Sequence, residues 1–181
     1  GTKEGCNEGD CGACTVMVTD RSGARALNAC ILFLPQLHGK ALRTVEGLTA
    51  PDGSLHPVQQ AMIDNHGSQC GFCTPGFVVS MATAHTNGDT DHDDALAGNL
   101  CRCTGYAPII RAAEAAQDAP IPDWIAQDAE RIAPYTAPEV TSGTTFAPET
   151  ADALAALYAE HPDATLVAGA PTWPRPAAVL S

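Results

Sequence analysis

The sequence predicts an α+β fold, with strands in the first part of the chain and helices after them. Three observations predict it. Two strand-like segments, Thr15–Thr19 and Arg25–Asn28, flank a turn at Asp20–Gly23, and Ala41–Val45 is a third candidate strand. Apolar residues recur at helical spacing from His56 onward. Eight cysteines form two sets of four, one set in each part.

The pattern further along the chain completes this expectation. Helices are expected near residues 57–66, 75–86, 92–97 and 108–117, and again over Ala151–Glu160, with a strand over Ala164–Ala168. Thr74 with Pro75 marks one helix start, Pro108 another, and Thr150 caps the helix at 151. We therefore expect domains at 1–50 and 51–117, a Pro-, Ala- and Thr-rich linker at 118–148, and a final segment at 149–181.

The composition excludes several classes of protein. Of the 181 residues, 45% are hydrophobic and 17% are charged, which is too much apolar material for a disordered chain. The net charge of −12, all of it from residues 51–181, argues against a nucleic-acid partner. No apolar run approaches the roughly 18 residues of a membrane span. No signal peptide precedes Gly1, so we expect a cytoplasmic protein without membrane association.

The cysteines are the candidate metal ligands. They are Cys6, Cys11, Cys14 and Cys30, then Cys70, Cys73, Cys101 and Cys103. The first set has the spacing C-x4-C-x2-C-x15-C, which is typical of plant-type [2Fe–2S] proteins. The second set, C-x2-C-x27-C-x-C, would on its own also suit structural zinc. Disulfides are disfavoured because the sequence shows no secretion signal.

The residues around the cysteines suit an anionic centre. Gly5, Gly9 and Gly12 alternate with the first three cysteines, and glycine lets the backbone wrap tightly and point N–H groups at sulfur. Both pairs of the second set directly precede helix starts, where the helix dipole favours negative charge. Zinc thiolates would gain from the same field. The six histidines show no ligand spacing, and we expect His66 and His85 on helix surfaces.

Three segments resemble the cluster-binding motifs of the molybdenum hydroxylases. They are GTKEGCNEGDCGAC at 1–14, QCGFCTPG at 69–76 and NLCRCTGY at 99–106. The order and separation of these motifs are highly specific, and the resemblance covers residues 1 to about 168. Within the family, the chain is most similar to the small iron–sulfur/FAD subunits of bacterial xanthine dehydrogenases, truncated at both ends. The resemblance implies a partial ferredoxin-like [2Fe–2S] domain at 1–50 and a four-helix-bundle [2Fe–2S] domain at 51–117.

The resemblance also implies a function. The chain would be an oxidoreductase subunit that is not catalytic alone, in a hetero-oligomer with a large subunit that binds the molybdenum cofactor. It would relay electrons from that cofactor through two [2Fe–2S] clusters toward FAD and NAD during purine hydroxylation. All eight cysteines would be cluster ligands, and Gln69 would contact the pterin. The alternatives are a related hydroxylase of aldehydes, carbon monoxide or N-heterocycles, and a zinc or redox-sensing protein.

The end of the chain resembles the family only in part. Leu166, Val167, Ala168 and Gly169 are similar to the first FAD-binding strand and loop, so 149–181 would be a truncated start of a FAD-binding domain. Three prolines follow within 171–176, and they cannot continue a helix or a central strand. FAD is therefore expected of the full-length family member rather than of this chain.

Overall fold

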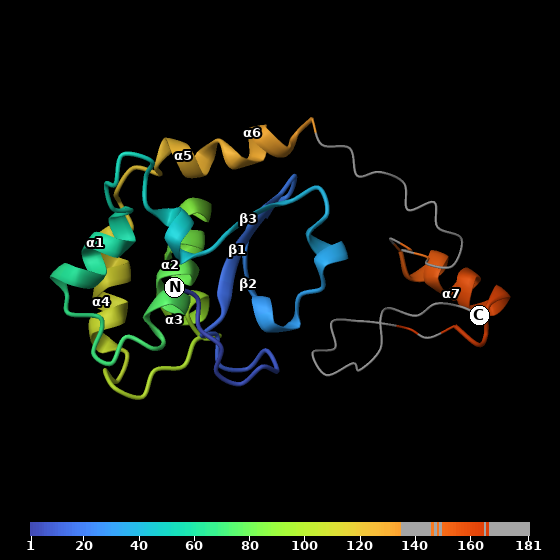
Figure 1. The fold of residues 1–181 in the computed structure, drawn as a ribbon, viewed down its shortest axis with the longest axis horizontal. Coiled ribbons are helices and arrows are strands. Elements are labelled where there is room, and N and C mark those ends of the chain that lie inside the picture. Colours follow the sequence, from blue (N-terminus) through green and yellow to red (C-terminus); the bar gives the residue numbers. More distant parts are fainter. Residues whose placement is uncertain (135–145, 147, 149, 165, 167–181) are drawn as a thin grey trace. The chain divides into compact units, whose positions relative to one another are not determined.

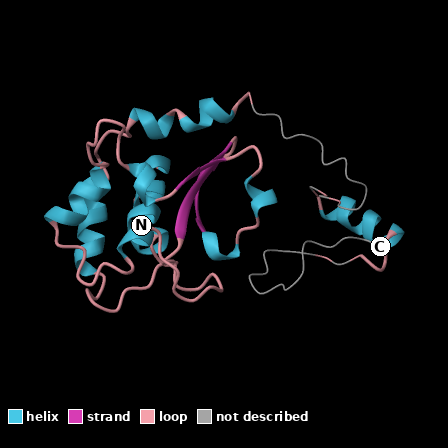
Figure 2. Ribbon diagram, viewed as in Figure 1, coloured by secondary structure: helices cyan, strands magenta, loops and turns pink. Residues whose placement is uncertain are grey.

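The computed structural model describes residues 1–134, 146, 148, 150–164 and 166, and it divides into two units, Gly1–Thr136 and Ala137–Ser181 (Figure 1). The strands are β1 (Thr15–Asp20), β2 (Gly23–Asn28) and β3 (Ala41–Arg43). The helices are α1 (Pro57–Asp64), α2 (Thr74–Asn87), α3 (His92–Ala95), α4 (Ala107–Ala116), α5 (Asp123–Ala126), α6 (Asp128–Ile132) and α7 (Ala151–Glu160) (Figure 2). None of the helices described is long and apolar enough to span a membrane.

The three strands form one antiparallel sheet in the order β2-β1-β3. The hairpin pairs Thr15 with Asn28 and Asp20 with Gly23, and its turn is held by Asp20, whose carboxylate accepts from the Ser22 amide at 2.9 Å. Hydrogen bonds from Ser22, and then the charge of Arg25, lower the pKa of Asp20 to about 2. The three strands expected between residues 15 and 45 are confirmed to within two residues at their ends, whereas the strand expected over Ala164–Ala168 lies mostly outside the described residues.

Helix α2 lies at the centre of the first unit. One side of α2 packs against β1 and β2, and another contacts α1 and α4, which lie beside each other (Figure 1). Every residue from Gly76 to His85 is buried. Met17 from the sheet, Phe77 from α2 and Ile109 from α4 are at most 1% exposed and belong to one continuous core. The segments 1–50 and 51–117 therefore share this core rather than each burying its own.

The four expected helices of the second segment are present, with one difference in how α2 begins. Its N-cap is Cys73, whose side chain makes no capping hydrogen bond. Thr74, expected as the cap, is the first helical residue, and its hydroxyl lies 2.8 Å from that of Ser68. In the second unit, the Thr150 hydroxyl accepts from the Ala153 amide at 3.1 Å, which confirms the predicted cap of α7.

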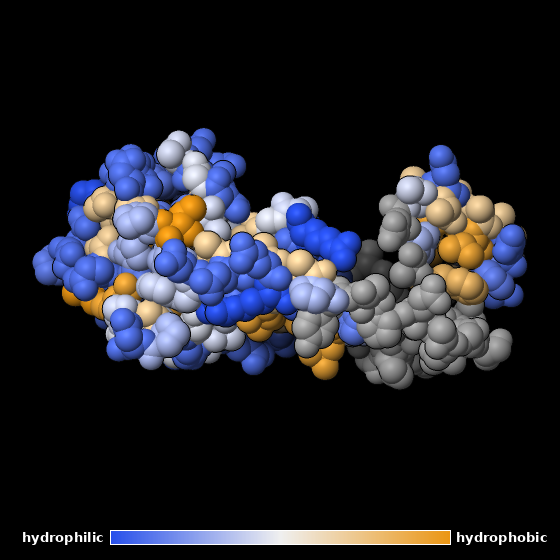
Figure 3. Space-filling model, turned by 90° about the horizontal axis from the view of Figure 1, so that it is seen from above, coloured by the Kyte–Doolittle hydropathy of each residue, from blue (hydrophilic) through white to orange (hydrophobic). Residues whose placement is uncertain are grey.

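The structure differs from the expected linker over 118–148 at the start of that segment. Residues 123–132 form α5 and α6, which contact each other, and α6 also contacts β1 and β3. Ile125 and Ile132 are buried, at 3% and 8% exposure. The composition predicted a linker because the segment is rich in Pro and Ala. The few apolar residues at helical spacing, Ile125 and Ile132 among them, nevertheless pack this segment against the rest of the unit. On the face drawn in Figure 3, the described residues are mostly polar, with apolar residues in separate spots.

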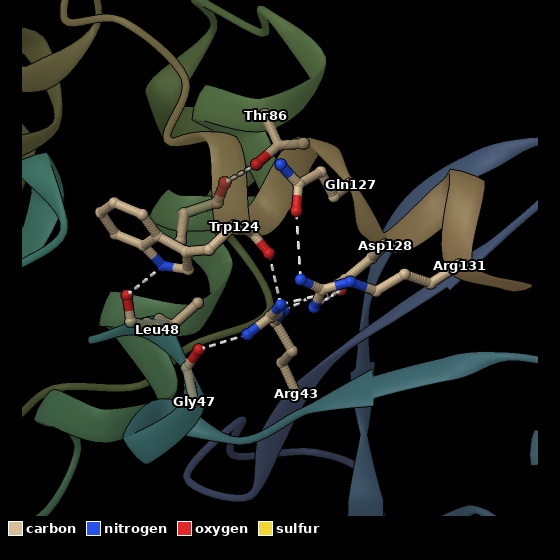
Figure 4. Close-up of polar contacts among 9 residues, drawn as sticks. Arg43, Gly47, Leu48, Thr86, Trp124, Gln127, Asp128 and Arg131 are labelled. Carbon is tan, nitrogen blue, oxygen red and sulfur yellow. Dashed lines mark hydrogen bonds and ion pairs between the residues drawn. The ribbon is translucent and has the colours of Figure 1, made fainter. Parts of the chain in front are cut away.

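Arg43 links residues 123–132 to the sheet through hydrogen bonds and an ion pair (Figure 4). The Arg43 guanidinium at the end of β3 forms a two-pronged ion pair with Asp128 of α6 and also donates to the Trp124 carbonyl. A further N–H of Arg43 donates to the Gly47 carbonyl at 2.6 Å, and the Trp124 indole N–H donates to the Leu48 carbonyl at 3.0 Å. The Asp128 side chain is only 6% exposed, so the pair is largely shielded from water.

Candidate metal centres

The hairpin register brings the first cysteine set together. Because Thr15 pairs with Asn28, Cys14 just before β1 lies beside Cys30 just after β2, and the Cys30 amide is 3.5 Å from Cys14 Sγ. The loop that precedes β1 turns back through Gly9 and Gly12, whose φ angles are 80° and 69°. Such angles favour glycine, so the spacing of glycines among these cysteines has a conformational cause.

Within this set the thiols lie in two pairs. Cys6 contacts Cys11, and Cys30 contacts Cys14. The amides of Asp10 and Cys11 each lie 3.3 Å from Cys6 Sγ. Backbone N–H groups of Glu8, Cys11 and Asp10 lower the pKa of Cys6 to about 6, because they stabilise the thiolate. Burial, followed by the contact with Cys14, raises the pKa of Cys30 to about 11.

The second set stands at two helix starts, as the sequence predicts. Cys70 and Cys73 precede α2, and Cys101 and Cys103 precede α4. Again the thiols form two pairs, Cys70 with Cys103 and Cys73 with Cys101. The first pair is exposed, whereas Cys101 is buried and Cys73 is partly buried. The segments before α2 and α4 thus present an inner and an outer pair of thiols.

Hydrogen bonds tune these thiols unequally. Burial, then the contact with Cys101, raises the pKa of Cys73 to about 12. The Phe72 backbone and then Cys103 lower the pKa of Cys70. Burial acts to raise the pKa of Cys101, but hydrogen bonds from Thr104 outweigh it and the net pKa is lowered. The Cys101 amide donates to the Tyr106 hydroxyl at 3.1 Å, which holds this loop in place.

The paired arrangement fits [2Fe–2S] clusters. Such a cluster takes four thiolates, two on each iron, so it needs two pairs rather than four ligands on one point. In the part of the chain that the structure describes, no three His, Cys, Asp or Glu side chains converge as a single-ion site requires. Backbone N–H groups aimed at Cys6 Sγ suit the negative charge of a thiolate-bound cluster. The four thiols of each set therefore suit the ligand requirement of a [2Fe–2S] cluster.

The structure gives only the exposure of the other predicted cofactor contacts, Gln69 for the pterin and Leu166 for FAD. Gln69 is exposed, directly before Cys70. Leu166 is 58% exposed, and Val167, Ala168 and Gly169 lie outside the described residues. His66 is exposed, as expected from the sequence, but it lies in the turn after α1 rather than on a helix.

The expectation for His85 is wrong. It is 7% exposed, and its Nε2 lies 2.8 Å from the Ala119 carbonyl, so it joins α2 to the segment after α4. Its ring meets that of His56, which is fully buried, edge to face at a centroid distance of 5.4 Å. The sequence of α2 contained a signal for this burial. A helix that is apolar on all sides is usually buried, and α2 has apolar residues on all sides.

Acid should destabilise the protein through His56. Burial, and then the neighbouring His85, lower the pKa of His56 to about 4, from an unfolded value of about 6.5. The folded state prefers neutral His56, so its contribution to stability is complete above pH 6.5 and is lost as the pH falls toward 4. Urea unfolding between pH 7.5 and 4.5 should show this loss. The variant His56→Asn, which keeps a capping acceptor for the Val58 amide, should flatten the profile, and exposed His66→Asn should not. Equal slopes in wild type and His56→Asn would contradict the assignment.

Comparison with known proteins supports an iron–sulfur centre at the second cysteine set. The family described as "[2Fe-2S] binding domain" matches residues 44–114. The chain is 48% identical over 123 residues to xanthine dehydrogenase 1 of Arabidopsis thaliana, and 49% identical over 122 residues to aldehyde oxidase 1 of Macaca fascicularis. Each alignment covers 62% of this chain, which spans only 9% of the length of either relative.

A solved structure gives the same picture at the level of the fold. The structure of quinoline 2-oxidoreductase from Pseudomonas putida 86 superposes with a TM-score of 0.54 at 35% identity, over 66% of this chain and 76% of the matched chain. A start of a FAD-binding domain is not confirmed by any of these matches. The chain belongs to the molybdenum hydroxylase family, as an iron–sulfur part that contains the [2Fe–2S] binding domain of xanthine dehydrogenases and aldehyde oxidases.

Proposed function

We propose that the chain is the electron-transfer part of a xanthine-dehydrogenase-type enzyme, with all eight cysteines as ligands of two [2Fe–2S] clusters. The observation that carries this proposal is the arrangement of each cysteine set as two thiol pairs within one unit of the structure. Each bound cluster would supply a site that takes up and releases one electron. The protein would bind the clusters, orient them and keep the inner thiols away from water.

The exposure of the thiols supports a direction for electron flow. Cys70 and Cys103 are exposed, with Gln69 beside them, so a partner's molybdenum cofactor could approach this centre closely. Apolar side chains surround the same loops, since Phe72 is 47% exposed and Leu100 is 51% exposed. Such residues suit burial against a large subunit. Electrons would enter at the second cysteine set, pass to the first, and leave toward FAD on a neighbouring domain or chain, then to NAD.

A second candidate concerns only the substrate. The identity to an aldehyde oxidase is 49%, which matches the 48% to a xanthine dehydrogenase, and the aligned solved structure is a quinoline oxidoreductase. The residues that would contact the substrate are expected on the partner subunit. An enzyme that acts on aldehydes or N-heterocycles is therefore the alternative to one of purine catabolism.

Metal content tests the first part of the proposal. Chain reconstituted under anaerobic conditions should hold about four irons and four acid-labile sulfides, two for each set of four cysteines. Two distinct paramagnetic signals should appear after reduction by dithionite. Stoichiometric zinc without sulfide would contradict the proposal and favour the zinc-protein alternative.

The substrate is tested on the assembled enzyme, as the second part of the same experiment. Xanthine added without oxygen to the chain bound to its molybdenum subunit should reduce both clusters, whereas an aldehyde or quinoline should not. The free chain should show no reduction by xanthine, since the molybdenum cofactor is expected on the partner subunit. Reduction by an aldehyde alone would replace xanthine with the alternative substrate class.

A further inference from the structure

A threonine hydroxyl lies against one of the buried cysteine sulfurs. Thr104 Oγ1 is 3.2 Å from Cys101 Sγ, and Cys101 is 7% exposed. Among the described residues, Thr104 is the one side chain other than a cysteine that hydrogen-bonds any of the eight sulfurs. In the first set, backbone N–H groups take this place, such as those of Asp10 and Cys11 on Cys6. The second set therefore has a hydrogen bond to sulfur that a change of side chain can remove.

The neighbouring hydrogen bonds fix the direction of this one. The Tyr106 amide donates to Thr104 Oγ1 at 3.2 Å, so the oxygen already serves as an acceptor on that side. A cysteine that ligates iron is a thiolate and has no proton to donate. The hydroxyl proton of Thr104 is therefore the one that lies between Oγ1 and Cys101 Sγ.

The loop before α4 is held so that this hydroxyl stays beside the sulfur. Gly105 and Tyr106 have φ angles of 67° and 69°, which turn the chain back at the end of the loop. The Cys101 amide donates to the Tyr106 hydroxyl at 3.1 Å, and the Tyr106 ring meets that of Phe77 in α2 edge to face at a centroid distance of 6.2 Å. Tyr106 thus contacts Thr104 through its amide and Cys101 through its hydroxyl, which fixes the two residues relative to each other.

We infer that Thr104 is a positioning residue for electron uptake, whose hydroxyl donates to Cys101 Sγ and raises the reduction potential of the second centre. This inference rests on the proposed function, because it needs a cluster on the second cysteine set. One electron, supplied by the partner's molybdenum cofactor or by dithionite, converts one ferric iron of that centre to ferrous. The ligand sulfurs then become more negative, so the hydrogen bond to Cys101 is stronger in the reduced state. The hydroxyl keeps its proton, and no covalent bond is made or broken.

A redox titration of the full chain with both clusters loaded tests the inference, with the paramagnetic signal of each cluster as the readout. Thr104→Val keeps the shape of the side chain but removes the hydroxyl. It should lower the equilibrium constant for reduction of the second centre about three- to tenfold, the range for loss of one hydrogen bond. A tenfold change is about 59 mV for one electron. The first centre should keep its wild-type potential, and Thr104→Ser, which retains the hydroxyl, should restore that of the second.

The matched control is Thr86→Val. It makes the same change within α2, where the Thr86 hydroxyl donates to the Ala82 carbonyl at 2.7 Å, and it should leave both potentials unchanged. Tyr106→Phe removes the acceptor of the Cys101 amide but keeps the Thr104 hydroxyl, so it reports loosening of the loop alone. It should shift the second potential by less than Thr104→Val does. Thr104→Ala removes the hydroxyl without leaving a methyl group beside the sulfur, and it should show the same fall if the valine variant does not load its second cluster.

The outcomes separate this inference from the proposed function. A second centre whose potential is unchanged in both Thr104→Val and Thr104→Ala would overturn the inference alone. A fall in potential that Thr104→Ser shares would also overturn it, because altered packing rather than the hydroxyl would then be the cause. Absence of the second iron–sulfur signal from the wild type would overturn the proposed function as well.

Discussion

Replacing Arg43 by alanine is expected to lower the free energy of unfolding by about 3–5 kcal/mol, the range for breaking one side of a shielded ion pair. Arg43 donates to Asp128, to the Trp124 carbonyl and to the Gly47 carbonyl, so alanine leaves several polar groups without their partner. The Asp128 side chain is 6% exposed and would remain as a charge in a poorly hydrated place. Denaturant unfolding of the full chain measures the loss.

Two comparisons make this prediction specific. Arg25→Ala breaks the ion pair with Asp20, in which the arginine side chain is 55% exposed, and should cost only about 0–1 kcal/mol. Arg43→Lys keeps the charge but loses the planar fork that serves carboxylate and carbonyls together, so it should lie between wild type and Arg43→Ala. An Arg43→Ala variant as stable as Arg25→Ala would mean that α5 and α6 pack without this clamp.

Local patterns in the sequence were enough to predict β1 to β3, α1 to α4 and α7, whereas α5 and α6 lie where a linker was expected. The hairpin follows from strand residues on either side of a turn that contains Asp20, Ser22 and Gly23. The helices of 51–117 follow from spacing and from prolines at their starts. The first cysteine set lies on one loop and one hairpin, whereas the second set lies before the starts of α2 and α4, so only its C-x2-C and C-x-C pairs are local in the sequence.

Contacts between distant segments could not be predicted in this way. The Arg43–Asp128 pair joins residues that are 85 positions apart in the sequence, and no local pattern around either residue predicts its partner. His85 looked like a surface residue when the helix was considered alone, and its burial follows from sheet and helices packing on α2 from different sides. The shared core has the same origin, because propensity and spacing describe each element but not the partner that it packs against.

The first turn of α2 offers the second large effect. Alanine at a helical position is favoured over glycine by about 1 kcal/mol, so Gly76→Ala would stabilise α2 if the helix stood alone. In the protein its Cβ would lie 2.1 Å from the Gly12 carbonyl oxygen and 3.1 Å from the Gly12 carbonyl carbon. These are backbone atoms between Cys11 and Cys14, so they cannot move aside as a flexible side chain would.

Gly76→Ala should therefore lower the free energy of unfolding by about 3 kcal/mol, the upper part of the range for overpacked interiors. It should also reduce the iron content, because the α2 start and the first cysteine loop must move apart. Gly98→Ala is the matched control in the neighbouring loop, where no atom lies within 4 Å of the added Cβ, and it should stay within about 0.5 kcal/mol of wild type. If Gly76→Ala gained stability, the helix preference would dominate, and the two loops would have to meet less closely than the glycine contacts require. Loss of stability and of iron in Gly76→Ala, with neither in Gly98→Ala, would show that close contact between the loops is needed to hold both sets of ligands.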